Sequence, residues 1–270
     1  MDQILSLAAG TLPEFAPANV ADAAGVAGFS HVGFTIAPDQ WDAAALAATK
    51  SAIARHGLKV LDVEVVWIPE GGQVDSQHRM IIDAGLELGA SNILVVSSEP
   101  DKDRTAEALH QLCEWAAPGQ MRVALEFLMI TAVQSMDDAL EIIALTDHRA
   151  AALLIDTIHF HRAGHHPADL EAISPDLLPY TQICDGNLHC IPDFEHYLED
   201  AIDLRKAPGD GELRVDEIIK ALPANIALSL EVRSKAYRDK YPDPGDRARS
   251  VRSATIQYLE SKGIFIPKDP

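Results

Sequence analysis

The sequence is poor in positive charge. It carries 22 Lys and Arg residues against 41 Asp and Glu, which gives a formal net charge of −19. Binding of nucleic acid or of an anionic membrane surface needs a basic stripe, so this composition argues against both kinds of partner. The same negative field disfavours strongly anionic substrates unless a metal ion or a local arginine offsets it.

Cysteines are scarce as well, and no long apolar run occurs. Cys113, Cys184 and Cys190 are odd in number and form no CxxC pair. This predicts no disulfide framework and a reducing compartment, for which the cytoplasm is the default. No apolar run approaches the roughly 20 residues of a transmembrane helix. The N-terminal residues lack the basic region of a signal peptide, so we expect them to lead into a first strand.

Apolar runs of strand type alternate with segments of helical period along all 270 residues. We expect strands at residues 4–8, 31–36, 59–68, 92–98, 122–127, 151–157, 180–184 and 226–231. Eight such units in about 250 residues predict a closed (β/α)8 TIM barrel, here a single α/β domain over residues 1–270. The competing fold is an open doubly wound sheet. It would normally show a glycine-rich phosphate loop after an early strand, and LAAGTLPE lacks that pattern.

The segment AALLIDTIHFHRAG, residues 151–164, joins a buried strand to a polar stretch. Five apolar residues precede Asp156, and His159 and His161 follow it. Taken alone, the segment fits two interpretations equally well. One is a capping aspartate followed by a solvated loop, and the other is a metal or proton-transfer site at a strand end.

Polar side chains also close or interrupt other predicted strands. They are Glu64, Glu126, Asp156, Gln182 and Glu231 on strands three, five, six, seven and eight. In a barrel these strand ends meet at one mouth, and a buried carboxylate is costly unless it is paired, hydrogen-bonded or metal-bound. Unrelated caps and ion pairs are the alternative to a shared cation. An oxygen-only donor set favours Mn²⁺ or Mg²⁺, with Co²⁺ or Zn²⁺ remaining open.

The motifs ALEF, IDTIHFHRAG, QICDG, RKAPGDGELRVDEII and SLEV resemble those of the xylose isomerase-like TIM barrel family over nearly the whole chain. This family includes sugar phosphate isomerases, ketose 3-epimerases, inosose-processing enzymes and some 3-dehydroshikimate dehydratases. The resemblance implies that Glu126, Asp156 and Glu231 are metal ligands. Most members have a histidine where this chain has Gln182, whose carbonyl oxygen we expect to be the fourth ligand, similar to what some dehydratases have.

The resemblance also implies roles for residues around the metal. His159 matches a position that helps bind substrate or relay protons, and Arg205 matches one that holds a substrate oxygen. Glu64 resembles an acid that contacts substrate in the epimerases. Asp185, in the QICDG motif, is a further expected substrate-binding residue. Trp67 lies just beyond Glu64 and is a candidate wall for a ring-shaped substrate.

A site of this composition suits proton abstraction next to a carbonyl group through an enediolate, with Glu126 and Glu231 as base and acid. Return of the proton to the neighbouring carbon gives an isomerase, and return to the opposite face gives an epimerase. We therefore expect an isomerase or epimerase of a small polyhydroxy carbonyl compound of the sugar, sugar phosphate or inosose type. Since relatives often form dimers or tetramers, a homo-oligomer is also expected.

Two other functions remain open. Loss of a β-hydroxyl group instead of proton return would make a dehydratase of the 3-dehydroshikimate type. Gln182, with Asp156 and His159, favours this function, whereas residues 69–73 after strand three offer no arginine for a substrate carboxylate. The second alternative is a barrel that has lost catalysis and acts as a binding or partner subunit.

Overall fold

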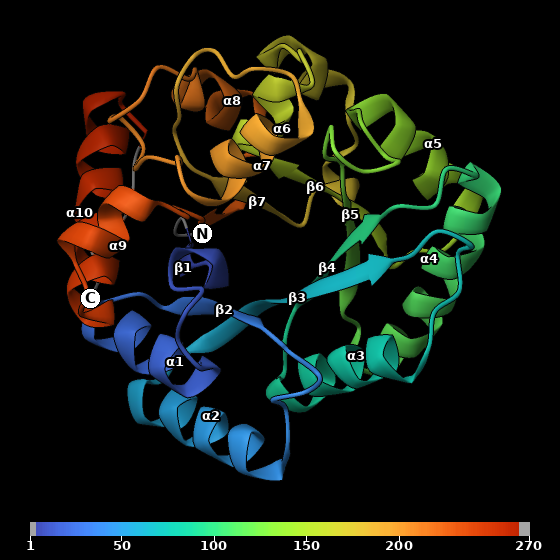
Figure 1. Ribbon diagram of the computed structural model, residues 1–270, viewed down its shortest axis with the longest axis horizontal. Helices are drawn as coiled ribbons and strands as arrows, with labels where there is room; N and C mark the ends of the chain where they lie inside the picture. Colours follow the sequence, from blue (N-terminus) through green and yellow to red (C-terminus); the bar gives the residue numbers. More distant parts are fainter. Residues whose placement is uncertain (1–3, 265–270) are drawn as a thin grey trace.

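Eight parallel strands close into a barrel in the computed structural model, which describes residues 4–264 (Figure 1). Each strand pairs with its neighbours in sequence, and β8 closes the ring on β1 through pairs such as Leu5–Leu228. The predicted (β/α)8 barrel is confirmed. The strands are β1 (Leu5–Leu7), β2 (His31–Thr35), β3 (Lys59–Ile68), β4 (Asn92–Ser97), β5 (Arg122–Glu126), β6 (Ala151–Asp156), β7 (Tyr180–Ile183) and β8 (Ala227–Leu230).

Helices surround the strands (Figure 1). The α-helices are α1 (Pro17–Val26), α2 (Ala43–His56), α3 (Ser76–Leu88), α4 (Lys102–Ala116), α5 (Met136–Thr146), α6 (Thr157–Arg162), α7 (Phe194–Ile202), α8 (Val215–Ala221), α9 (Lys235–Lys240) and α10 (Pro244–Ser261). Short 3₁₀ helices lie at η1 (Ala9–Thr11), η2 (Ala117–Gly119), η3 (Pro167–Ala172) and η4 (Pro175–Leu177). No helix within residues 4–264 combines the length and the hydropathy needed to cross a membrane.

The ends of α2 and α3 show how local sequence fixes the length of a βα unit. Asp42 accepts a hydrogen bond from the Ala45 N–H at 2.8 Å and begins α2, and Asp75 begins α3 in the same way. Gly57 and Gly89 end these helices in the left-handed conformation, with φ of 63° and 71°. Aspartate at the start and glycine just past the end are the expected capping residues.

Apolar side chains form two separate cores. The larger core lies between the strands and the helices, and a smaller one lies within the barrel. Because side chains alternate along a strand, Leu5 and Leu7 pack outward while Ser6 between them faces the interior. The aliphatic part of the interior comes mainly from β4, β5 and β6, with Leu94, Val96, Ala124, Ala152 and Leu154. Leu61 of β3 and Ala227 of β8 add to it, and polar side chains such as Ser6 and Ser229 occupy other interior positions.

Asp62 on β3 is the most unusual of these interior polar residues. It is 0% exposed, and neither carboxylate oxygen has a hydrogen-bond partner among the described residues. Gly33 on β2 makes room for it, since a Cβ at that position would lie 2.6 Å from Asp62 Oδ1. Burial, with a contribution from the Glu231 charge, raises the pKa of Asp62 to about 7. The carboxyl group therefore holds a proton in the folded protein under mildly acidic conditions.

We expect Asp62→Asn to stabilise the protein by an amount that grows as pH rises from about 4 to about 7. The pKa of Asp62 is raised from 3.8 to about 7 on folding, so the wild type loses stability over this window as the unfolded chain releases the proton first. Asparagine cannot ionise and avoids this loss. Urea unfolding of both proteins at several pH values, in the presence of a chelator, would measure this difference in the free energy of unfolding.

Asp39→Asn, which removes one carboxylate from an exposed position, serves as the control. If Asp62→Asn changes the free energy of unfolding by the same amount at every pH, the raised pKa of Asp62 is contradicted.

Candidate metal centre and active site

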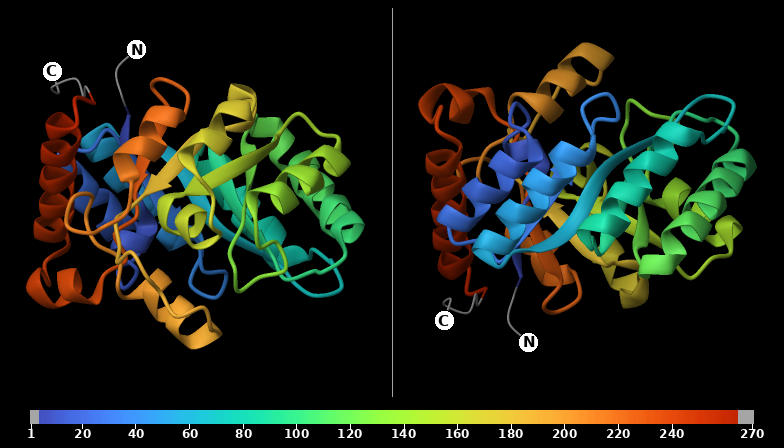
Figure 2. Two further views of the ribbon diagram at one scale, coloured as in Figure 1. Left: turned by 90° about the horizontal axis from the view of Figure 1, so that it is seen from above. Right: turned by 90° about the horizontal axis from the view of Figure 1, so that it is seen from below.

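A cavity of about 320 Å³ lies at the carboxyl ends of the strands. The helix α7 projects from the barrel on this side (Figure 2). Its polar lining includes Glu64, Glu126, Gln182 and Glu231. Its apolar lining comes from Val65, Trp67, Leu94, Val96, Leu128, Ile130, Leu198, Ala201 and Ile202. The volume and the mixture of apolar walls with a few convergent polar groups are those of a small-molecule site.

Asp156 ends β6 and begins α6 in the next residue. Its Oδ1 accepts hydrogen bonds from the backbone N–H groups of Ile158 at 2.8 Å and His159 at 3.5 Å. The aspartate is thus a helix cap, as one interpretation of the segment proposed. The solvated loop of that interpretation is wrong, because residues 157–162 form a helix and His159 is only 3% exposed.

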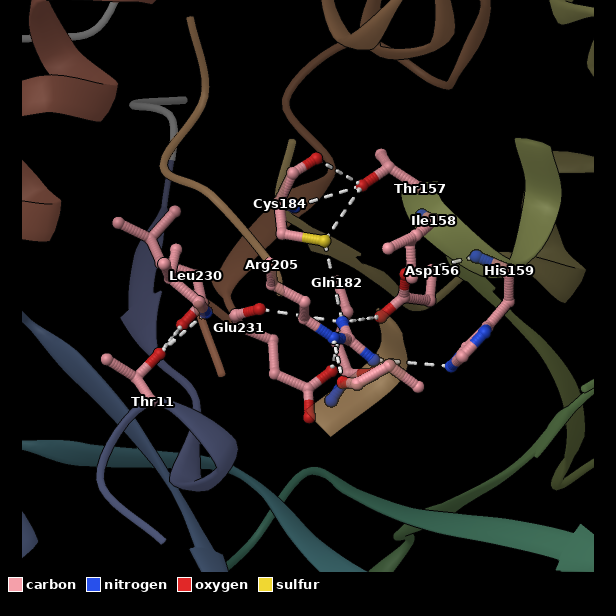
Figure 3. Close-up of polar contacts among 12 residues, drawn as sticks. Thr11, Asp156, Thr157, Ile158, His159, Gln182, Cys184, Arg205, Leu230 and Glu231 are labelled. Atoms are coloured by element: carbon pink, nitrogen blue, oxygen red, sulfur yellow. Dashed lines mark hydrogen bonds and ion pairs between the residues drawn. The ribbon is translucent and has the colours of Figure 1, made fainter. Parts of the chain in front are cut away.

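The guanidinium of Arg205 lies at the centre of this arrangement (Figure 3). Its Nη1 donates to Asp156 Oδ2 at 2.6 Å and to Glu231 Oε2 at 3.0 Å, and its Nη2 donates to His159 Nε2 at 3.3 Å. Its Nε donates to the carbonyl oxygen of Ala201 at 2.6 Å, which ties it to the end of α7. One buried cation therefore bonds to three of the predicted site residues.

A buried hydrogen bond sets the tautomer of His159. Arg205 can only donate, so His159 Nε2 must accept and its Nδ1 must carry the proton. That proton is directed at the Tyr197 hydroxyl, 2.6 Å away, which also accepts from the Met129 N–H at 3.3 Å. Burial lowers the pKa of His159 to about 4, so the ring is neutral near pH 7. A neutral imidazole with its Nε2 lone pair facing the site is the form that binds metal.

The donor atoms fit a divalent metal ion. Glu126, Asp156 and His159 each offer one ligand atom, and these three atoms lie within 4.8 Å of one another. Glu126 Oε1 and Gln182 Oε1 are buried and have no hydrogen-bond partner within residues 4–264. Buried oxygens without a partner are costly, and a cation would satisfy them.

The carboxyl groups of the site differ in their pKa values. Burial raises the pKa of Glu126 well above its usual range, and the neighbouring Asp156 and Glu231 charges raise it further. Burial also raises the pKa of Glu231 and takes that of Glu64 to about 7. The pKa of Asp156 is lowered, because the charge and hydrogen bond of Arg205 outweigh its burial. Asp156 thus remains ionised while the glutamates readily hold protons.

Three of the four predicted substrate-binding residues line the cavity, namely Glu64, Trp67 and Arg205, and one does not. Glu64 accepts hydrogen bonds from Thr35 at 3.1 Å and from Gln182 at 3.4 Å, and Trp67 is 43% exposed at the rim. Asp185 is absent from the cavity lining. Its carboxylate accepts hydrogen bonds from the backbone N–H groups of Gly186, Gly209, Gly211 and Leu213. Its position therefore indicates that it holds the loop after β7 together.

Sequence reasoning did not find Tyr197. The residue lies 38 positions after His159 on α7, and only the packing of α7 against α6 brings the two together. A buried ion pair between Arg162 Nε and Asp200 Oδ2, at 2.8 Å, fixes the same two helices. No motif in the sequence signals this pairing, since it depends on where α7 docks.

The structure is a closed, parallel eight-stranded barrel, and carboxylates and an imidazole lie at its mouth, where the active sites of such barrels are found. The family model described as xylose isomerase-like TIM barrel matches residues 18–254. The chain belongs to this family. A comparison of the sequence with curated proteins gives no match.

Several solved structures share the fold. The IOLI protein with a binding zinc atom has a TM-score of 0.79 at 17% identity, over 97% of this chain and 99% of that one. D-allulose 3-epimerase from Methylomonas sp., in complex with D-allulose, has a TM-score of 0.70 at 14% identity, over 97% and 98%. A xylose isomerase-like TIM barrel/4-hydroxyphenylpyruvate dioxygenase fusion protein has a TM-score of 0.77 at 20% identity, over 100% of this chain and 45% of that one.

We expect Tyr197→Phe to disturb the tautomer of His159. Without the hydroxyl, the buried Nδ1–H loses its acceptor, so part of the population should shift its proton to Nε2 and break the contact with Arg205. Nitrogen NMR of histidine-labelled protein would show the shift. The free energy of unfolding should fall by about 1–3 kcal/mol, the cost of one unsatisfied buried polar group.

Tyr241→Phe, outside the cavity lining, is the matched control. An unchanged His159 nitrogen spectrum in Tyr197→Phe would show that another group sets the tautomer.

Proposed function

We propose that the protein is a divalent-metal-dependent isomerase or epimerase of a small polyhydroxy carbonyl compound. The observation that carries the proposal is the convergence of the Glu126, Asp156 and His159 ligand atoms within 4.8 Å, next to unpartnered buried oxygens. The similarity to a D-allulose 3-epimerase and to a zinc-containing IOLI protein supports both the reaction class and the metal.

The ligands in this proposal are Glu126, Asp156, Gln182 and Glu231. Mn²⁺ or Mg²⁺ suits an oxygen-rich donor set, with Zn²⁺ or Co²⁺ as alternatives. When bound, the ion would polarise the substrate carbonyl and offset the negative charge that develops on its oxygen. Glu126 at the end of β5 and Glu231 just after β8 come from widely separated positions in the ring of strands. They can therefore address different faces of one small molecule.

Proton transfer falls to these two glutamates. Burial raises the pKa values of both carboxyl groups well above their usual range, and a raised pKa suits a carboxyl group to general acid–base catalysis. One glutamate takes the proton from the carbon next to the carbonyl, and the other returns a proton. Glu64 and Trp67 line the cavity, and in this proposal Glu64 bonds a substrate hydroxyl and Trp67 packs against the carbon skeleton. The apolar walls exclude bulk water from the exchanging proton.

Glu231→Gln should slow turnover by about 10²–10⁴-fold while metal binding and folding persist. The amide oxygen can still accept from Arg205, but it cannot take or return a proton. Deuterium exchange into ketoses and inososes in D₂O, followed by NMR, measures proton abstraction whichever product forms.

Glu217→Gln, on the exposed face of α8, is the control and should exchange at the wild-type rate. Unchanged exchange in Glu231→Gln with metal bound would remove the acid–base role. Failure of the wild type to retain any divalent metal would favour a non-catalytic barrel.

A dehydratase of the 3-dehydroshikimate type is the second candidate, and one observation favours it. Arg233 lines the cavity and forms no ion pair or hydrogen bond with any residue among 4–264. The sequence offered no arginine after strand three for a substrate carboxylate, and Arg233 supplies one from the end of β8 instead. Gln182, in place of the histidine that most family members have, also favours a dehydratase.

Incubation with 3-dehydroshikimate distinguishes the two candidates. A dehydratase converts it to an aromatic product with strong ultraviolet absorption, and Arg233→Met should then raise KM about tenfold or more by removing a charge-assisted bond of roughly 1.5–3 kcal/mol. No absorbance change with metal-loaded wild type would leave the isomerase or epimerase as the function. Arg149→Met, at an exposed position, controls for the loss of one charge.

A further inference from the structure

The geometry points to a competition inside the site: Arg205 is a built-in counter-cation that a metal ion displaces, and His159 then becomes the nitrogen ligand of that ion. This inference rests on the metal dependence in the proposed function and goes beyond it. It adds a ligand that the oxygen-only donor set of Glu126, Asp156, Gln182 and Glu231 does not include. It also gives Arg205 a role before substrate arrives.

The strongest argument comes from the lone pair of His159 Nε2. An imidazole nitrogen without a proton has one lone pair, and here that lone pair accepts a hydrogen bond from Arg205 Nη2 at 3.3 Å. A metal–nitrogen bond needs the same lone pair. Arg205 and a metal ion therefore cannot both use His159 at the same time.

The hydrogen bonding of His159 allows its Nε2 atom to exchange the Arg205 guanidinium for a metal ion. Its Nδ1–H is held by the Tyr197 hydroxyl at 2.6 Å, so the ring cannot present a proton at Nε2 without losing that bond. Metal-binding histidines commonly donate their second ring nitrogen to a fixed acceptor, which orients the ring. The Nε2 atom is also the ring nitrogen on the side of Arg205 and its carboxylate partners (Figure 3).

Charge explains why the two cations replace each other rather than coexist. Arg205 Nη1 neutralises Asp156 and Glu231 at 2.6 and 3.0 Å in a buried site. Removal of one partner of a buried ion pair is strongly destabilising, so Arg205 leaves these carboxylates readily only when another cation takes its place. A divalent ion among ligand atoms within 4.8 Å of one another would stand close to the guanidinium and repel it.

The cavity provides space for the displaced guanidinium of Arg205. Arg205 lines the cavity, and its Nε is anchored to the Ala201 carbonyl oxygen at 2.6 Å, so its Nη groups can swing while the base of the side chain stays fixed. Once released from Asp156 and Glu231, they can donate to a substrate oxygen. Metal binding would thus free the arginine that the substrate uses, which makes the metal bind first and the substrate second.

Titration of Mn²⁺ by calorimetry into wild type, Arg205→Met and Arg233→Met tests the competition. Arg205→Met should bind Mn²⁺ about tenfold or more tightly than wild type, which is roughly 1.4 kcal/mol. Arg233→Met removes the same charge from the same cavity but breaks no bond to these carboxylates, so its Mn²⁺ affinity should change far less.

Arg205→Met leaves two buried carboxylates unpaired, which destabilises the fold, so the wild type provides a second measurement that does not depend on this variant. Nitrogen NMR of histidine-labelled wild type, titrated with Zn²⁺, should move the His159 Nε2 resonance from its hydrogen-bonded to its metal-coordinated position. His159→Gln assigns that resonance.

Equal Mn²⁺ affinity in wild type and Arg205→Met, or a His159 resonance that Zn²⁺ leaves in place, overturns the competition but leaves the proposed function standing. If neither ion binds to any of these proteins, the competition and the metal dependence of the proposed function fail together.

Discussion

The buried pairing of Arg205 with Asp156 and Glu231 is the interaction on which the mouth of the barrel depends. Through it, one guanidinium connects the end of β6, the residue after β8 and, by its bond to Ala201, the end of α7. It also sets the protonation of its neighbours, since it keeps Asp156 ionised and fixes which nitrogen of His159 carries the proton. The negative charge that the strand ends bring together is tolerated because this cation lies among them.

A second constraint is the uneven interior of the barrel. Aliphatic side chains of β4, β5 and β6 fill one part of it. In the other part, polar atoms of Ser6, Asp62, Tyr180 and Ser229 have no hydrogen-bond partner among the residues that the structure describes. Glu64, the candidate substrate contact, and Glu231, the candidate acid–base residue, continue this polar part towards the mouth. Their raised pKa values thus come from burial together with the charges of nearby carboxyl groups, and in this way the packing of the barrel prepares the chemistry of the site.

The sequence predicted the barrel and the strand-end residues because both follow from local periodicity. Alternation places Glu126, Asp156 and Gln182 on inward faces, and parallel strands bring their ends to one mouth. Asp185 shows the limit of this reasoning. Its motif suggested a substrate contact, but its carboxylate binds four backbone N–H groups of the loop after β7. Whether a carboxylate faces a cavity or a loop depends on how that loop folds back. The periodicity of the sequence does not predict the path of the loop.

For the segment 151–164, the sequence determined that a buried strand ends in Asp156 and that histidines follow. Only the tertiary structure decided that this aspartate both caps α6 and pairs with Arg205, and that His159 is buried against Tyr197. Strand and helix periods depend on residues that are close together in the sequence, so they can be read from the sequence directly. The buried partners of Asp156 and His159 lie 49 and 38 positions further along the chain, and they meet only once the barrel has closed and α7 has docked on α6.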